Sequence, residues 1–384
     1  MNKKLLAVAI GAALGVSPML AQAANLGVTA VGADEVKHPV GFQVGGMAQV
    51  EIAREEVSTK TAGVTADVHT TTVEDNSRGR FWIAADEDLG GGMRAMAHFE
   101  FRVDTTGVCA LETGGSTCAA ANANTREKWV GLKTGIGTVK LGSIQAPYKY
   151  AGGVKWDAFV TTNLEARGNG GMSGGVFGHN NFFDNSVAYT SPSFAGVSFG
   201  LAYSFDDVND TANGQTADDG DYSAAVEWNG KFGGGFGIHL IGALSHNADN
   251  RIAVTPANSD VADQTKIGAK FTFAKNFAVI AQYEMLTDAR VVGGIDRTDD
   301  KVLFLAFNAT IGPVLAAIQY GKTEQGGAAT NNDIDYVALG AFYNFSKTFN
   351  VFTGYRITDS QQTLAAVDNG VETKVLTFGM RKVF

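Results

Sequence analysis

Cysteine and proline are scarce in this 384-residue chain, which has two cysteines and six prolines but 48 glycines. Positive charge is also scarce, because 30 lysines and arginines face 39 acidic residues and leave a formal net charge of −9. Without a basic tract, we expect no nucleic-acid partner. Long apolar runs are missing beyond residue 23, although 45% of the chain is hydrophobic. That absence excludes a helical membrane protein, which would show several runs of about 20 apolar residues.

The one long apolar run lies at the N-terminus. Two lysines precede apolar residues 5–16, and Ala21-Gln22-Ala23 supplies a small-x-small cleavage site. Basic, apolar and small-residue zones in this order are typical of a secretory signal peptide, whereas a buried N-terminal helix would not need that order. We therefore expect residues 1–23 to be a signal peptide and residues 24–384 to form the exported domain.

Apolar and polar residues alternate through almost the whole exported part, and residues 93–103 show the pattern best. Met93, Phe99 and Val103 fall on one face, whereas His98 and Glu100 fall on the other. Successive side chains of a strand point to opposite faces, so a strand separates these sets and a helix would mix them. About sixteen such segments begin near residues 40, 78, 93, 126, 137, 184, 196, 221, 235, 264, 276, 298, 313, 332, 348 and 371.

The connections between these segments alternate in length. Tight connections such as Gly90-Gly91-Gly92 and Ser346-Lys347 are separated by longer polar ones. Short periplasmic turns and long outer loops produce this rhythm in bacterial outer-membrane barrels, whose strand number is usually even. We therefore predict an all-β fold, a transmembrane antiparallel β-barrel of about 16 strands.

A soluble β-sandwich is the alternative, because its strands alternate too. Sandwiches usually end within roughly 100 to 250 residues, whereas this pattern continues to the C-terminus without a linker rich in proline or serine. A barrel in hydrocarbon must also close, since an open sheet edge would leave backbone groups without hydrogen bonds. We expect residues 374–384 to pair with the first strand.

The two cysteines, Cys109 and Cys118, stand nine positions apart in a segment rich in glycine, threonine and alanine. In an exported chain we expect them to form a disulfide. A metal site would need more ligands, and residues 108–119 offer only Glu112. We predict no metal site.

Catalytic chemistry has little support in the sequence. The six histidines are scattered and none stands in a nucleophile motif, although His98 and His239 fall on faces that we predict to be inward. A barrel phospholipase would need such a histidine beside a serine nucleophile. The glycines of residues 168–175 follow no predicted phosphate-binding strand. We expect neither enzymatic activity nor a cofactor.

Four stretches carry a resemblance to a known family. They are residues 77–78 with 86–95, residues 126–132 with 137–142, residues 185–189 with 191–192, and residues 379–384 with their terminal Phe384. These stretches resemble the trimeric general-diffusion porins of Gram-negative bacteria, in which a terminal phenylalanine is similar to the signal of the outer-membrane assembly machinery. The resemblance covers nearly all of the chain after the signal peptide.

The resemblance implies a sixteen-stranded barrel in the outer membrane, assembled as a homotrimer and in contact with lipid and lipopolysaccharide. Small hydrophilic solutes and ions would diffuse passively through its water-filled channel. The third outer loop, residues 144–183, would fold into the barrel. Its acidic residues Asp157 and Glu165 would stand opposite basic residues on the wall and make a transverse field that filters ions.

Five basic residues are candidates for the wall of this constriction. Arg80 and Arg126 match the family's wall arginine positions on the second and fourth strands, and both are expected to face the lumen. Arg94, Arg102 and Lys140 are further candidates.

Two departures from the family pattern leave the ion selectivity open. Ser143 and Phe183 stand where an arginine is common in the family. Two other functions also stay open. Trp156 and Phe159 in the third loop are compatible with a substrate-selective porin that binds sugars, and a barrel plugged by its loops would be structural or an adhesin.

Overall fold

The computed structural model describes residues 41–75, 79–103, 105–106, 125–174, 182–205, 220–247, 262–292, 295–325, 331–364 and 367–384. The predicted signal peptide and both cysteines lie outside these ranges. The signal peptide and the disulfide therefore stay predictions.

Within the described residues, seventeen strands form a single sheet. They are β1 (Gly41–Thr61), β2 (Val64–Glu74), β3 (Arg80–Gly90), β4 (Met93–Arg102), β5 (Thr125–Thr134), β6 (Gly137–Gln145), β7 (Phe182–Thr190), β8 (Val197–Ser204), β9 (Asp221–Lys231), β10 (Gly237–Asn247), β11 (Ala262–Phe273), β12 (Phe277–Val292), β13 (Ile295–Ile311), β14 (Val314–Glu324), β15 (Asn331–Ser346), β16 (Phe349–Leu364) and β17 (Val367–Val383).

Among the described residues, helical structure is confined to short pieces, namely α3 (Pro147–Tyr150), η1 (Gly153–Lys155) and η3 (Gly233–Gly235). In the part of the chain that the structure describes, no helix has the length and apolar character needed to cross a membrane.

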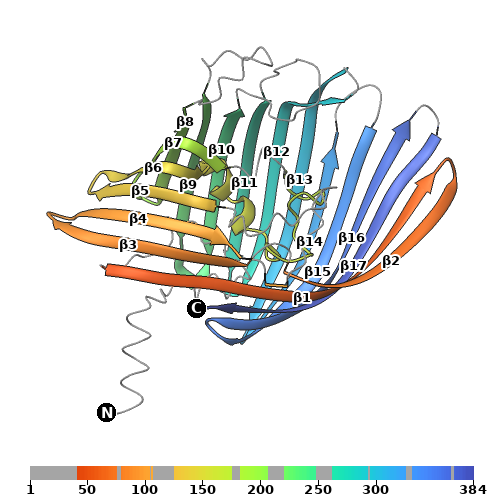
Figure 1. The fold of residues 1–384 in the computed structure, drawn as a ribbon, viewed down its shortest axis with the longest axis horizontal. Coiled ribbons are helices and arrows are strands. Elements are labelled where there is room, and N and C mark those ends of the chain that lie inside the picture. The colour runs from red at the N-terminus through yellow and green to blue at the C-terminus, as the bar shows by residue number, and fades with distance from the viewer. Residues whose placement is uncertain are drawn as a thin grey trace.

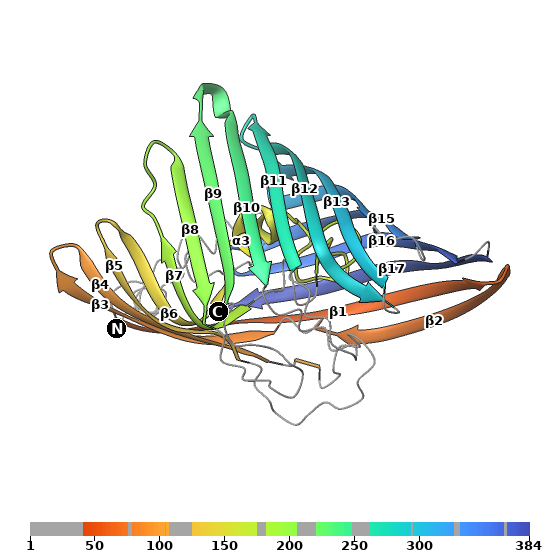
Figure 2. The ribbon, with the colours of Figure 1, turned by 90° about the horizontal axis from the view of Figure 1, so that it is seen from above.

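The sheet closes on itself where the first and last strands meet (Figures 1 and 2). β1 and β17 pair antiparallel, from Met47 opposite Val383 to Lys60 opposite Gly370. The amide of Gly46 donates to the carbonyl of Phe384 over 2.9 Å, and the amide of Phe384 donates back over 3.0 Å. The predicted pairing of the C-terminal residues with the first strand is therefore confirmed, and the barrel has no open edge at this seam.

The second position around the barrel is shared by two strands. Residues 41–47 of β1 pair with β3, whereas residues 51–61 pair with β2. The seventeen described strands thus fill sixteen positions, which confirms the predicted all-β barrel of about 16 strands. Sequence reasoning did not find β2, because its apolar residues alternate only over residues 64–68 and three threonines follow at residues 70–72.

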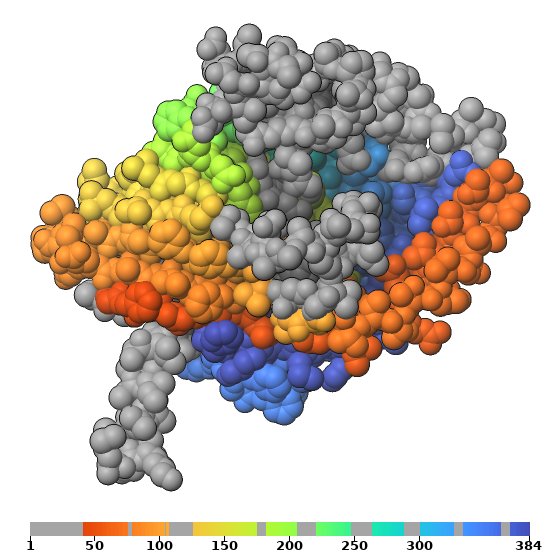
Figure 3. All heavy atoms as spheres, viewed as in Figure 1, coloured from red at the N-terminus to blue at the C-terminus, as the bar shows by residue number. Residues whose placement is uncertain are grey.

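The two faces of the barrel wall differ in polarity, as the alternation predicted. In β4, Met93 and Phe99 are exposed on the outside, whereas His98 and Glu100 are fully buried inside. The outward face of the other strands likewise carries large exposed apolar side chains, such as Leu339 in the middle of β15. Figure 3 shows the outside of this wall along β3 to β6. A wall with an apolar outside and a polar inside suits contact with hydrocarbon.

The apolar outward face yields a stability prediction. We expect Leu339→Arg to lower the free energy of unfolding by about 2–4 kcal/mol, because it places a charge in the lipid-facing middle of a strand. Leu339→Ile, which keeps the face apolar, should change it little. Equilibrium urea unfolding of the protein in lipid vesicles measures both variants, and equal stability of the arginine variant and the parent would contradict the assignment of this face.

Candidate functional site

The long connection between β6 and β7 runs through the inside of the barrel. β6 ends at Gln145 and β7 begins at Phe182, which lie close to the ends of the loop expected at residues 144–183. Figure 2 shows α3 inside the ring of strands. Most described residues of this third loop are buried, and Tyr148 and Phe159 are completely so. The loop therefore occupies part of the lumen.

An apolar core fixes the loop against one side of the wall. Trp156, Phe159, Leu164 and Met172 of the loop belong to one buried cluster. The wall side chains of this cluster include Ile241, Ile280, Phe304, Leu315, Tyr336, Phe342 and Phe352, from β10 and from β12 to β16. Full burial of each large apolar side chain stabilises the packed loop by about 1.5–3 kcal/mol. Because Trp156 and Phe159 face this core, they do not present aromatic rings to solutes in the passage.

Glycines in the wall make room for the loop. A Cβ added at Gly321 of β14 would lie 2.1 Å from the Cα of Gly171 in the loop. At Gly354 of β16 it would lie 2.4 Å from Cδ1 of Leu164. Real Cβ atoms essentially never make contacts this short. Glycine therefore lets the loop backbone approach closely at Gly321, and it makes room for the Leu164 side chain at Gly354.

Polar contacts anchor the first part of the loop to β9, β11 and β12. The hydroxyl of Tyr148 donates to Glu284 over 2.8 Å, and its amide donates to Ser223 over 3.0 Å. Lys266 donates to the carbonyl of Tyr148, and the amide of Gly153 donates to a side-chain oxygen of β12 over 2.7 Å. Burial and the nearby Glu284 raise the pKa of Tyr148 well above its usual value, so the hydroxyl keeps its proton and stays a donor.

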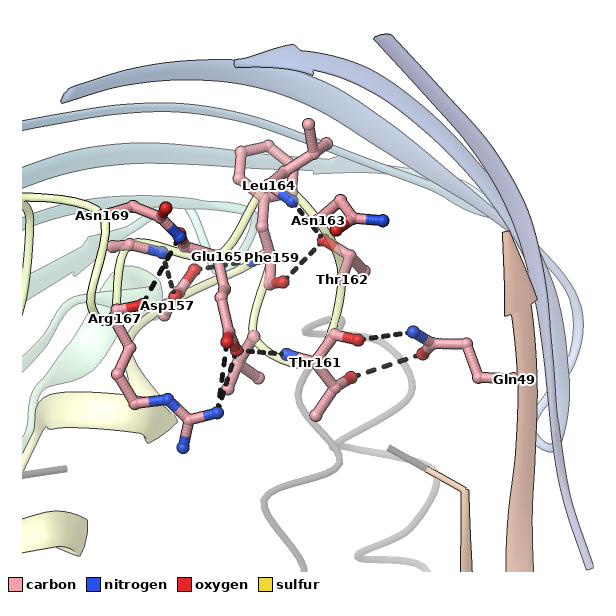
Figure 4. A network of polar contacts seen from close by, with 12 residues as sticks. Gln49, Asp157, Phe159, Thr161, Thr162, Asn163, Leu164, Glu165, Arg167 and Asn169 are labelled. Atoms are coloured by element: carbon pink, nitrogen blue, oxygen red, sulfur yellow. Dashed lines mark hydrogen bonds and ion pairs between the residues drawn. The ribbon is translucent and has the colours of Figure 1, made fainter. Parts of the chain in front are cut away.

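A second set of contacts joins the loop to the closing strands β1 and β17. Figure 4 shows the contacts between Thr161 and Gln49 of β1. Gln49 donates to the carbonyl of Thr161, and Arg381 donates to the Thr161 hydroxyl over 2.7 Å and to Gln49 over 2.8 Å. Thr161 has a φ of 74°, in the left-handed region that a β-branched residue rarely adopts. These contacts hold it there, and nearby the amide of Asn163 donates to Glu51 over 3.2 Å.

The two acidic residues predicted to face the wall hold the loop's own shape (Figure 4). The buried carboxylate of Asp157 accepts 2.8 Å hydrogen bonds from the amides of Phe159 and Ala166, and burial raises its pKa to about 6. Glu165 accepts from the amide of Thr161 over 3.0 Å and forms a 3.1 Å ion pair with Arg167. Their place at a constriction remains a prediction, but these contacts lie within the loop.

Opposite the loop, the two arginines predicted for the wall converge on one carboxylate. Arg126 forms an ion pair with Glu100, and Nε of Arg80 lies 3.9 Å from the same carboxylate. The register between β4 and β5 shifts after Phe99, so that both Arg126 and Glu127 lie beside Glu100 on the inside. The structure therefore brings Arg80 and Arg126 together across β3, β4 and β5.

The other three predicted wall residues share this inward face. Arg94 pairs with Asp86 over 2.8 Å, and the ammonium of Lys140 lies 4.5 Å from the ring centre of Trp129. Arg102 is half-buried on the inward side of β4. The inside of β3 to β6 is thus basic, with carboxylates interspersed.

Sequence reasoning missed two cations of the loop itself, Lys149 and Arg167. The ammonium of Lys149 lies 4.3 Å from the ring centre of Phe182, and the guanidinium of Arg126 lies 5.1 Å from the same ring. Burial, followed by the charges of Arg126, Arg167 and Arg80, holds the pKa of Lys149 well below its usual value. Loop and wall therefore both place cations in this part of the lumen.

Comparison with known proteins places this geometry in a family. A family model described as Gram-negative porin matches residues 7–363. The chain belongs to the Gram-negative porin family. This porin is an outer-membrane channel for passive diffusion of small hydrophilic solutes and ions, because its family, closed barrel and polar lumen agree. Porins are channels rather than enzymes.

The relatives of this porin are distant in sequence, but the similarity covers most of their length. It is 25% identical over 315 residues to outer membrane protein YedS of Escherichia coli, covering 77% of this chain and 82% of the relative. It is 27% identical over 278 residues to major outer membrane protein P.IB of Neisseria gonorrhoeae, covering 68% and 72%.

Solved structures share the fold of this porin. The anion-selective porin from Comamonas acidovorans superimposes with a TM-score of 0.63 at 19% identity, covering 90% of this chain and 99% of that one. Salmonella typhi OmpF, in complex with daunomycin, gives a TM-score of 0.55 at 17% identity and covers 88% and 97%.

The close approach at Gly321 yields a prediction about the loop. Gly321→Val should push the loop off the wall and raise the single-channel conductance by roughly twofold. The reason is that the loop fills part of the lumen and so limits the conducting cross-section. Gly242→Val is the control, since a Cβ there meets only a side-chain carbon of Val226, at 3.7 Å. Planar-bilayer recordings of both variants test this, and a parental conductance in a folded Gly321→Val protein would contradict it.

Proposed function

We propose that the passage is narrowest between the third loop and the inside of β3 to β6, and that it favours small anions over cations. The loop packs its apolar side onto β10 to β16, so its remaining side borders the basic wall. The observation that carries this proposal is the grouping of Arg80 and Arg126 on the wall with Lys149 and Arg167 on the loop.

The balance of charge around this space supports an anion preference. The loop and the wall bring four basic groups to this space, those of Arg80, Arg126, Lys149 and Arg167. The neighbouring carboxylates are three, those of Glu100, Glu127 and Glu165. A narrow passage with low-dielectric walls and an excess of one charge concentrates the opposite ion. The Comamonas acidovorans structure, described as anion-selective, has the same fold and agrees with this sign.

The preference differs from the arrangement that the family resemblance implies. There, acidic loop residues oppose basic wall residues, whereas here Asp157 binds backbone amides inside its loop. Because the loop side near the wall carries Lys149, both sides of the proposed constriction are basic. The resulting field favours anions instead of only orienting dipoles across the passage.

The proposed selectivity depends on individual cations. Arg126→Gln and Lys149→Gln should each lower the anion-to-cation permeability ratio by roughly fivefold, the effect of removing about 1 kcal/mol of attraction near a unit charge. Lys322→Gln is the control, because Lys322 lies at the outer end of β14 and pairs with Glu324 over 3.1 Å. Reversal potentials in a salt gradient measure the ratio, and an unchanged value in both lumen variants would sink the proposal.

The selectivity should also depend on pH through Lys149. Its depressed pKa means that the ammonium is fully charged only at lower pH and loses its proton below the range usual for lysine. The anion preference should therefore fall as pH rises through that lowered pKa. The neighbouring Tyr150 keeps its proton, because burial raises its pKa well above the usual value. Lys149→Gln should flatten the pH profile of the reversal potential, and a parental profile in that variant would count against this assignment.

We further propose that three copies assemble, each with its own channel, and that the protein has no catalytic activity. A Vibrio cholerae outer-membrane protein with the same fold, at a TM-score of 0.52 and 14% identity, is described in a trimer form. Channel closure in three equal steps, together with the mass of the detergent-folded particle, tests the assembly. Silent but well-folded barrels would favour a plugged structural barrel or adhesin.

A further inference from the structure

An apolar groove of about 570 Å³ lies on the outer face of the barrel, away from the lumen. It is lined by Phe232, Gly233, Phe236, Gly237, Ile238, Phe271, Thr272 and Phe273, at the ends of β9, β10 and β11. Phe232 and Phe236 are more than half exposed. A hollow of this size is large enough to hold part of a small molecule, and its lining is almost entirely hydrocarbon.

Glycines keep the groove open. A Cβ at Gly233 would meet no atom within 4 Å, and Gly234 and Gly235 have φ angles of 72° and 82° that favour glycine. On one side, the rings of Trp228 and Phe232 fold over Gly230, within 2.6 and 3.1 Å of a Cβ built there. The turn therefore leaves bare backbone between aromatic side chains.

The position of the groove decides which lipid can reach it. It lies at the β9–β10 connection, which is one of the short connections. This turn is seen at the top of Figure 2. Short connections face the periplasm in outer-membrane barrels. The adjoining leaflet is the phospholipid leaflet, whereas lipopolysaccharide lies at the opposite end of the strands.

One lysine stands at the periplasmic rim of the groove. The stem of Lys275 lies over Gly235, to whose carbonyl the Lys275 amide donates over 3.2 Å. Lys275 is exposed, and no lining residue of the groove is acidic. Lysine stems can lie along apolar surface while their ammonium groups reach the lipid headgroup level.

We propose that this groove binds an anionic phospholipid of the periplasmic leaflet. One acyl chain lies between the aromatic side chains, and the phosphate lies against Lys275. The apolar lining matches the chain, and the charge of the rim matches the headgroup. The site is separate from the channel, because its lining residues lie on the outer face.

The test uses the folded protein in lipid vesicles that contain phosphatidylglycerol with a photoreactive group in one acyl chain. After illumination, mass spectrometry of peptides locates the adducts. We expect them to concentrate in residues 228–240 and 269–275. The variant Lys275→Gln should weaken the apparent affinity, measured as adduct yield against phosphatidylglycerol fraction, by about fivefold, which is the contribution of one lysine near a charged surface.

Two further variants test the apolar groove and the specificity of the lysine effect separately. Gly233→Trp should fill the groove and lower adduct yield for phosphatidylglycerol and phosphatidylcholine alike. Lys347→Gln removes an exposed lysine from the β15–β16 turn and should leave the adducts unchanged. All variants should keep the parental conductance, which separates failure here from failure of the proposed channel selectivity. Adducts spread evenly over the outer face, an equal loss in Lys347→Gln, or protection of the groove by a second copy would each overturn the proposal.

Discussion

The whole structure depends on hydrogen bonding of the backbone where water is absent. In hydrocarbon every amide and carbonyl of a strand needs a partner within the protein, and only a closed sheet supplies one for each. Here the seam between β1 and β17 completes the circle, down to the reciprocal bonds of Gly46 and Phe384. The same seam carries Gln49 and Arg381, which hold Thr161 of the third loop. Residues of the strands that close the barrel therefore also hold the loop that narrows its lumen.

The lumen is divided because its two sides offer the loop different surfaces. β10 to β16 present apolar side chains, with glycines among them in β14 to β16, so a loop with large apolar residues packs closely there. β3 to β6 present arginines, carboxylates and Lys140 instead. In the proposed constriction, water and ions pass along this second side. The chemistry of solute passage thus follows from where the apolar core of the loop is able to form.

Several features could be predicted from the sequence because they depend on local order along the chain. Strict alternation predicts strands and their two faces, and connection lengths predict which ends face the periplasm. β2 escaped prediction because its alternation is limited to residues 64–68 and ends in three threonines. The neighbours of Arg126 depend on a register shift between β4 and β5, which places Arg126 and Glu127 together on the inside. Alternation counted along β5 alone does not contain that shift, and the family pattern supplied the position of Arg126.

By itself the sequence determined the class of fold, the closed barrel, the loop that enters it and the set of basic residues on the wall. Periodicity predicted the first two, and the resemblance to the porin family implied the loop and the wall residues. Only the tertiary structure decided which charges meet. Asp157 binds the amides of its own loop, and Lys149 joins the arginines of the wall, because burial and packing of the loop determine where each side chain points. Contacts between residues far apart in the chain depend on that packing, which no local pattern encodes.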